Sequence, residues 1–115
     1  MTLPFRPQGP SAKLAYADDS TDTATELAPG SYGAPNSLYI FNADAANVVV
    51  VNYSFDSLDH NAVVPTSGFN GLGVVVGPNG TAQILVDSTY QTNSLYISVA
   101  GVSGTGNVYV TPGWI

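Results

Sequence analysis

The sequence has no cysteine, and it has no lysine or arginine after residue 13. Without cysteine there is no disulfide framework and no thiol chemistry. Arg6 and Lys13 are the only basic residues, whereas the chain carries eight carboxylates and a formal net charge of −6. Two cations cannot neutralise a phosphate backbone or an anionic lipid surface. We therefore expect no binding to nucleic acid or membranes. No window approaches the ~18 apolar residues of a membrane span, and Met1–Pro10 lacks the apolar segment of a signal peptide.

Charged residues of either sign are also scarce. They make up 9% of the chain, against about 25% in an average soluble protein, although 44% of the residues are hydrophobic. The surface is therefore built from Ser, Thr, Asn, Gln and backbone, which cost less to desolvate than Lys and Glu. Such a surface suits broad contact with a protein partner, outside the cell or in a virion. The alternative is an all-β domain that simply tolerates few charges.

Helix signals are missing, because no stretch repeats apolar residues at helical spacing over three turns. Short β-branched or aromatic runs are separated by turn residues at close spacing, which is typical of an antiparallel β-sandwich or jelly roll. We predict one such domain over residues 11–115, preceded by an extended N-terminal arm over residues 1–10. The predicted strands are Ser11–Ala17, Thr23–Leu27, Ser37–Asn42, Asn47–Phe55, Leu72–Val76, Thr81–Asp87, Ser94–Ala100 and Asn107–Thr111.

One segment occurs twice. The run Asn-Ser-Leu-Tyr-Ile at residues 36–40 returns at residues 93–97, and each copy precedes a run that opens with Asn-Val. The repeat predicts two related core hairpins, with Val102–Gly106 as the turn of the second. Alternation places Leu38 and Ile40 on one face of the first strand, and Tyr39 and Phe41 on the other.

Two further patterns predict how strands are placed. Four consecutive valines, Val48–Val51, indicate a strand that is either central or covered on both faces. Pro78-Asn79-Gly80 separates two apolar runs, and Asn-Gly accepts the positive φ angles of a type I′ turn. We therefore predict that residues 74–76 pair with residues 84–86 as a hairpin.

The N-terminal arm carries proline at every third position of Met1–Pro10, which favours an extended, polyproline-like chain without ladder bonds. Phe5 and Arg6 give this arm one aromatic and one cationic anchor for a neighbouring subunit. An untethered terminus is the alternative. The candidate protein-interaction residues of this region are Phe5, Arg6, Pro7 and Lys13.

Residues 56–73 show no periodic pattern of apolar residues, which predicts one long loop. This loop either protrudes and carries contacts, or it is disordered or has no functional role. His60, the only histidine, lies in it. No Gly-x-Ser-x-Gly element presents a serine to this imidazole, so we expect no catalysis and no enzyme. His60 and Phe69 complete the candidate protein-interaction residues.

Two other groups suggest ligands less strongly than structure. Asp18, Asp19 and Asp22 crowd three carboxylates that suit Ca²⁺, but no Asp-x-Asn-x-Asp-Gly loop is present, so a solvated acidic turn is favoured. Seven tyrosines and Trp114 are spread along the chain, which favours packing or interfaces over a carbohydrate platform. We expect no metal and no cofactor.

Three motifs, in order, resemble a family of small virion proteins of tailed bacteriophages. They are Phe5-Arg6-Pro7-Gln8-Gly9, then Leu38–Asn42 before the valine run, and finally Val108-Tyr109-Val110-Thr111-Pro112-Gly113. They cover about a quarter of the chain. The acidic turn at residues 18–22 and the loop at residues 56–73 depart from the family pattern.

The resemblance implies a non-enzymatic decoration, or cement, protein that binds the major capsid protein on the outside of the shell and stabilises it. Such proteins are homo-oligomers, often trimers, and the particle is assembled in the host cytoplasm and released by lysis. A second hypothesis is a tail, fibre or adaptor component, including a receptor- or glycan-binding β module whose surface is the 56–73 loop together with the scattered tyrosines.

Overall fold

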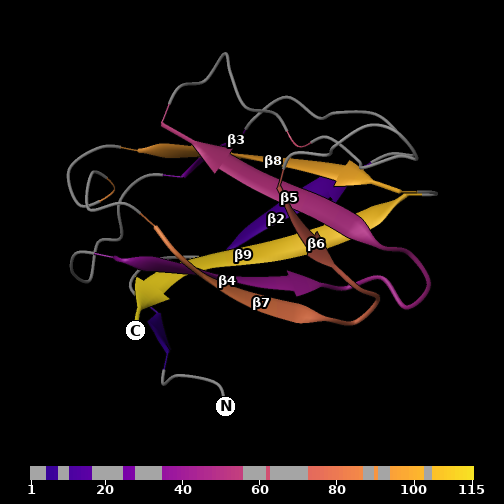
Figure 1. Cartoon of the computed structure of the whole chain (residues 1–115), viewed down its shortest axis with the longest axis horizontal. Helices are drawn as coiled ribbons and strands as arrows, with labels where there is room; N and C mark the ends of the chain where they lie inside the picture. The colour runs from indigo at the N-terminus through magenta and orange to yellow at the C-terminus, as the bar shows by residue number, and fades with distance from the viewer. Residues whose placement is uncertain are drawn as a thin grey trace.

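The structure is a computed structural model that describes residues 5–7, 11–16, 25–27, 35–55, 62, 73–86, 90, 94–102 and 105–115. These residues form nine strands and no α-helix, and every strand pair is antiparallel. The strands make two sheets that pack face to face (Figure 1). The predicted all-β sandwich is confirmed.

The five-stranded sheet has the order β1-β9-β4-β7, with β2 also paired to β9, and the four-stranded sheet has the order β3-β8-β5-β6. Each of the eight predicted strands overlaps an observed one, and β1 was not predicted. The bounds are β1 Arg6–Pro7, β2 Ala12–Tyr16, β3 Thr25–Leu27, β4 Ser37–Asn42, β5 Val49–Ser54, β6 Val74–Val76, β7 Thr81–Leu85, β8 Leu95–Gly101 and β9 Gly106–Trp114.

The two predicted hairpins of the repeat are wrong. The first copy lies in β4 of the five-stranded sheet, but β5, the next strand, belongs to the four-stranded sheet; β8 and β9 are divided in the same way. Instead β4 pairs with β9, and β5 pairs with β8. Both short connections therefore cross the sandwich, and the two copies occupy interior positions of opposite sheets (Figure 1).

The predicted pairing of residues 74–76 with residues 84–86 is also wrong, although the turn between them forms. Gly80 N donates to Gly77 O at 2.9 Å, and Asn79 has a φ of 53°. Proline cannot adopt the positive φ that a type I′ turn requires at its first central residue, so Pro78-Asn79 fits a type II turn. This turn leads from β6, paired with β5, across the sandwich to β7, paired with β4.

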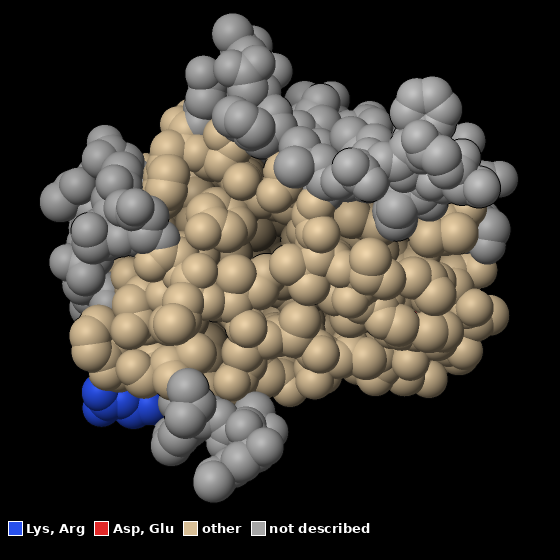
Figure 2. Space-filling view, viewed as in Figure 1, with Lys and Arg blue, Asp and Glu red and all other residues tan. Residues whose placement is uncertain are grey.

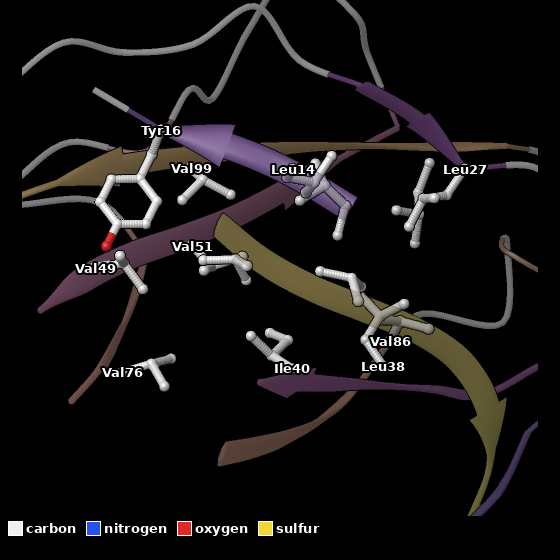
Figure 3. Packing of buried hydrophobic residues seen from close by; sticks show 14 of the residues in the cluster. Leu14, Tyr16, Leu27, Leu38, Ile40, Val49, Val51, Val76, Val86 and Val99 are labelled. Carbon is white, nitrogen blue, oxygen red and sulfur yellow. The ribbon is translucent and has the colours of Figure 1, made fainter. Parts of the chain in front are cut away.

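The core lies between the sheets and is built from aliphatic side chains of both (Figure 3). Leu38 and Ile40 are fully buried, whereas Tyr39 and Phe41 are half-buried on the opposite face, as the alternation predicted. Tyr90 is the largest fully buried side chain, and burial raises the pKa of its hydroxyl to about 12. The buried residues labelled in Figure 3 are Leu14, Tyr16, Leu27, Leu38, Ile40, Val49, Val51, Val76, Val86 and Val99.

The valine run is central, as predicted, because β5 lies between β8 and β6. Val49 and Val51 point into the core, while Val50 is buried on the outer face against Ala62 and Ala100. Ala62 comes from the predicted 56–73 loop, and its N–H donates to Ser98 Oγ at 2.9 Å. This residue of the loop thus lies against the four-stranded sheet rather than protruding from it.

The described part of the arm makes ladder pairs, contrary to the prediction. Arg6 pairs with Trp114 and Pro7 with Gly113, so β1 and β2 follow each other along one edge of β9. An edge position tolerates Pro7, because its missing N–H can face solvent. Residues 1–4 and 8–10 lie outside the described residues.

Candidate interaction surface

The outer face of the five-stranded sheet carries a cluster of aromatic side chains. Since Leu38 and Ile40 point inward, Tyr39 and Phe41 of β4 and their cross-strand neighbours point outward. Register places Tyr109 of β9 opposite Phe41, Lys13 of β2 opposite Tyr109, and Thr81 of β7 on the other side of Phe41. The result is one row across four strands, with a cation at its edge and a hydroxyl at its far end.

The second part of this surface is the docked Phe5. Its ring centroid lies 5.3 Å from that of Tyr39, with the planes inclined by 44°. The ring rests over Gly113, where any Cβ would collide with it. Ser37 is fully buried, and its Oγ donates to Gly113 O at 3.0 Å. The absence of a side chain at Gly113 therefore leaves the space in which Phe5 packs against the aromatic cluster.

Both basic residues of the protein lie in strands that pair with β9, and both are exposed. Only Lys13 faces this surface, because it lies opposite the outward Tyr109, whereas Arg6 lies opposite Trp114, which alternates with the outward residues of β9. The described carboxylates lie elsewhere: Glu26 is in β3 of the other sheet, and Asp44 is in the connection after β4. The outer face thus combines aromatic rings with a cationic edge on an otherwise acidic protein. We call this set the aromatic face: Phe5, Lys13, Tyr39, Phe41 and Tyr109.

The structure brings four of the six predicted interaction residues to one place. Phe5, Arg6, Pro7 and Lys13 all lie along β9, whereas His60 and Phe69 fall outside the described residues, as do Asp18, Asp19 and Asp22. Sequence reasoning missed Tyr109 and did not connect Tyr39 or Phe41 with the arm. Alternation identified an outward aromatic pair in β4, but only the register of β9 supplies its neighbours.

A buried polar cluster lies at the end of the sandwich where the β4–β5 and β6–β7 connections meet. Asn42 is fully buried; its Nδ2 donates to Asn47 O at 2.8 Å and to Gly77 O at 3.1 Å. Its Oδ1 accepts from Asp44 N at 3.1 Å. The two connections are further joined by Asn79 N, which donates to Asp44 O at 2.8 Å. Asn42 therefore fixes the relative position of two crossings.

Asp44 in this cluster accepts three hydrogen bonds, from Ala46 N, Asn47 N and Asn47 Nδ2. Its Oδ1 accepts from the backbone N–H groups of Ala46 at 2.7 Å and Asn47 at 2.9 Å, and these bonds hold the pKa of the carboxyl below its usual range. Such a group stays ionised at neutral pH and does not suit proton transfer. We infer that the cluster has a structural role.

The Tyr16 hydroxyl is buried beside the Asp44 carboxylate. Both approach Gly106 so closely that a Cβ there would lie 2.5 Å from the hydroxyl and 2.7 Å from Asp44 Oδ2. The hydroxyl lies near the carboxylate but has no hydrogen-bond partner. Burial raises the pKa of Tyr16, and the nearby Asp44 charge adds to the effect.

In the described part of the chain, no three His, Cys, Asp or Glu side chains come together as a metal site would require. The same residues include no helix that is long and apolar enough to cross a membrane. No protein-family model matches the chain, and a comparison with curated proteins finds no match either.

Proposed function

We propose that this protein is a non-enzymatic virion component that binds the outer surface of a capsid and stabilises the shell, a decoration or cement protein. The observation that carries the proposal is that the three motifs of the phage resemblance share one sheet. The segments containing Phe5–Pro7, Leu38–Asn42 and Val108–Gly113 lie in β1, β4 and β9, which are adjacent. Motifs that are separate in sequence thus lie in neighbouring strands of one sheet, and their outward residues share its outer face.

The make-up of the aromatic face supports docking to protein. Tyrosine is among the residues that most often dominate the binding energy of protein interfaces. Tyr109 remains 37% exposed, and Lys13, opposite it in β2, is also exposed, so both are available to a partner. The cationic edge favours an acidic patch on the capsid, here proposed to be on the major capsid protein.

The proposal is tested by adding the purified protein to capsids that lack it, followed by co-sedimentation and quantification of copies per particle. A decoration protein saturates in hundreds of copies. Tyr109→Ala and Lys13→Glu should each raise the capsid Kd at least about tenfold. Tyr96→Ala is the matched control, because Tyr96 is half-buried in the other sheet, and it should bind as the wild type does. Equal losses for Tyr109→Ala and Tyr96→Ala, or no binding of the wild type, would contradict the proposal.

A second candidate is a receptor- or glycan-binding module of a tail or fibre. The row of Tyr109, Phe41 and Thr81 supports it, because aromatic rings and hydroxyls on a flat sheet face also suit stacking on sugar rings. This function predicts few copies per virion and a saturable hit on a glycan array that Tyr109→Ala removes. The absence of any such hit, together with hundreds of copies on the head, would exclude it.

A further inference from the structure

The turn between β6 and β7, residues 77–80, is hydrogen-bonded both within itself and to the end of β4. Inside the turn, Gly80 N donates to Gly77 O at 2.9 Å. From outside, Asn79 N donates to Asp44 O at 2.8 Å. Asn42 N donates to Gly80 O at 2.9 Å. The main chain of residues 79 and 80 therefore belongs to the contact that joins the β4–β5 and β6–β7 connections, which lie at the same end of the sandwich in Figure 1.

The same turn contains a chemically labile pair, Asn79-Gly80. In an Asn-Gly pair the backbone nitrogen of the glycine can attack the side-chain amide carbon of the asparagine. Glycine favours this attack, because it has no Cβ to shield its nitrogen and its backbone takes up conformations that other residues avoid. Asn79 is exposed and lies at a positive φ of 53°. Its carboxamide is therefore in contact with water, which the later hydrolysis consumes.

We propose that Asn79 is a site of spontaneous covalent modification, at which the side-chain amide is converted to a carboxylate at a rate that the turn controls. In the first step Gly80 N forms a bond to Cγ of Asn79, and Nδ2 leaves as ammonia together with the proton of Gly80 N. The product is a five-membered succinimide. Water then opens this ring. Cleavage of the bond between Cγ and the nitrogen gives aspartate, and cleavage at the backbone carbonyl gives isoaspartate.

The folded turn opposes the first step. The attacking nitrogen must lose its proton, but the N–H of Gly80 is donated to Gly77 O. The bond from Asn79 N to Asp44 O holds the main chain against the rotation that would bring Gly80 N to Cγ. Pro78 stiffens the turn further by fixing its own φ. The reaction therefore proceeds from the small population in which the turn has opened, and the free energy of this local opening sets the rate.

The modification changes both the charge and the main chain of this turn. Residues 73–86 contain no Asp, Glu, Lys, Arg or His. Figure 2 shows this side of the molecule as uncharged over its described atoms, except for basic atoms at the lower left. A carboxylate at position 79 thus adds a negative charge where there was none. Isoaspartate also inserts a methylene group into the main chain before Gly80, which displaces Gly80 from Gly77 O and from Asn42 N.

Incubation of the purified full chain in mildly alkaline buffer, with and without denaturing urea, tests the proposal. Anion-exchange chromatography separates the more acidic product, and peptide mass spectrometry measures conversion at residue 79. We expect conversion in both conditions, at least about tenfold faster in urea, where the hydrogen bonds of the turn are lost. Pro78→Ala should speed conversion in the folded chain about two- to fivefold, because the opened turn gains conformational freedom. Pro7→Ala is the matched control: Pro7 is exposed in β1, and its replacement should leave the rate unchanged.

Far-UV circular dichroism verifies that both proline variants are folded. No conversion of residue 79 in urea would overturn the site itself. Equal rates in the folded and the unfolded chain, or equal effects of Pro78→Ala and Pro7→Ala, would overturn the control by the turn. The purified isoaspartate form should unfold at a lower urea concentration than its parent, and an unchanged midpoint would contradict the loosened contact. All of these measurements use the isolated chain, so their outcome is independent of capsid binding.

Discussion

Replacement of Asn42 by alanine is expected to destabilise the protein strongly, although Asn42 takes part in no proposed binding surface. The side chain is fully buried, and its amide holds the β4–β5 connection to the β6–β7 connection. Alanine keeps the β4 backbone unchanged but removes both the Nδ2 donor and the Oδ1 acceptor. The variant therefore isolates the contribution of this one amide.

The magnitude follows from the groups that lose their partner. The carbonyls of Asn47 and Gly77, bonded to Nδ2 at 2.8 and 3.1 Å, lose this donor, and Asp44 N loses its acceptor at 3.1 Å. Each buried polar group without a partner costs about 1–3 kcal/mol, whereas Asp44 is only half-buried and water can replace its bond. With a small cavity added, we expect a loss of about 3–5 kcal/mol, a large fraction of the 5–15 kcal/mol typical of a domain.

Urea unfolding followed by far-UV circular dichroism and Trp114 fluorescence measures this loss. With a slope of about 1–3 kcal/mol per M, the midpoint should fall by about 2 M. Asn36→Ala is the control: Asn36 is half-buried and bonds the terminal Ile115, with 3.0 Å from Ile115 N to Oδ1, so its loss should cost only about 1 kcal/mol. If Asn42→Ala cost no more than Asn36→Ala at an unchanged slope, the reasoning from buried, unpaired groups would be refuted.

Gly113→Ala should destabilise by about 1–3 kcal/mol, because the new methyl collides with the Phe5 ring and with the Arg6 carbonyl oxygen. In a double-mutant cycle with Phe5→Ala, measured by thermal unfolding, the double variant should lose at least about 1 kcal/mol less free energy of unfolding than the sum of the two single variants. Strict additivity would contradict the packing of Phe5 on Gly113. Tyr16→Phe removes a buried hydroxyl that has no hydrogen-bond partner. The free energy of unfolding from urea titration should therefore stay equal or rise by up to about 1 kcal/mol. A clear loss of stability would show that the hydroxyl does bond Asp44. Since the folded-state pKa of Asp44 is lowered, its carboxylate stabilises the fold above its unfolded pKa of about 4, and this stabilisation is lost as pH falls through the folded pKa. The stability difference between wild type and Asp44→Asn should therefore shrink in acid, and a difference independent of pH would contradict this account.

The sequence predicted the local features of the fold well. Short β-branched or aromatic runs between turn residues identified the eight strands. Alternation identified the inward face of Leu38 and Ile40, because the two-residue side-chain period belongs to each strand by itself. The valine run was predicted to be either central or covered, since a run without polar residues must be covered on both faces, and its residues 49–51 lie in the central strand β5. The predicted strand over residues 107–111 was too short at both ends. In the structure β9 continues to Trp114, with Pro112 opposite Leu38.

Part of the candidate site was also within reach of the sequence. Phe5, Arg6 and Lys13 stood out, because an aromatic and the only two cations of the chain gather before residue 14. That Phe5 and Lys13 share one sheet face with Tyr109 and Phe41 was not predictable from the sequence. It requires the antiparallel register of β9 against both β2 and β4, and these strands are far apart in the chain.

The repeated Asn-Ser-Leu-Tyr-Ile separates what is local from what is not. By itself the sequence determined that each copy is a strand with buried Leu and Ile and an outward tyrosine, because backbone geometry fixes the alternation within a strand. Only the tertiary structure decided that the chain crosses to the opposite sheet after each copy, instead of turning back to form a hairpin with it. A short connection permits either course, and the choice rests on the joint packing of two apolar sheet faces and on buried groups such as Asn42, which hold the crossings together. Pairing is thus a property of the whole core, and no single segment encodes it.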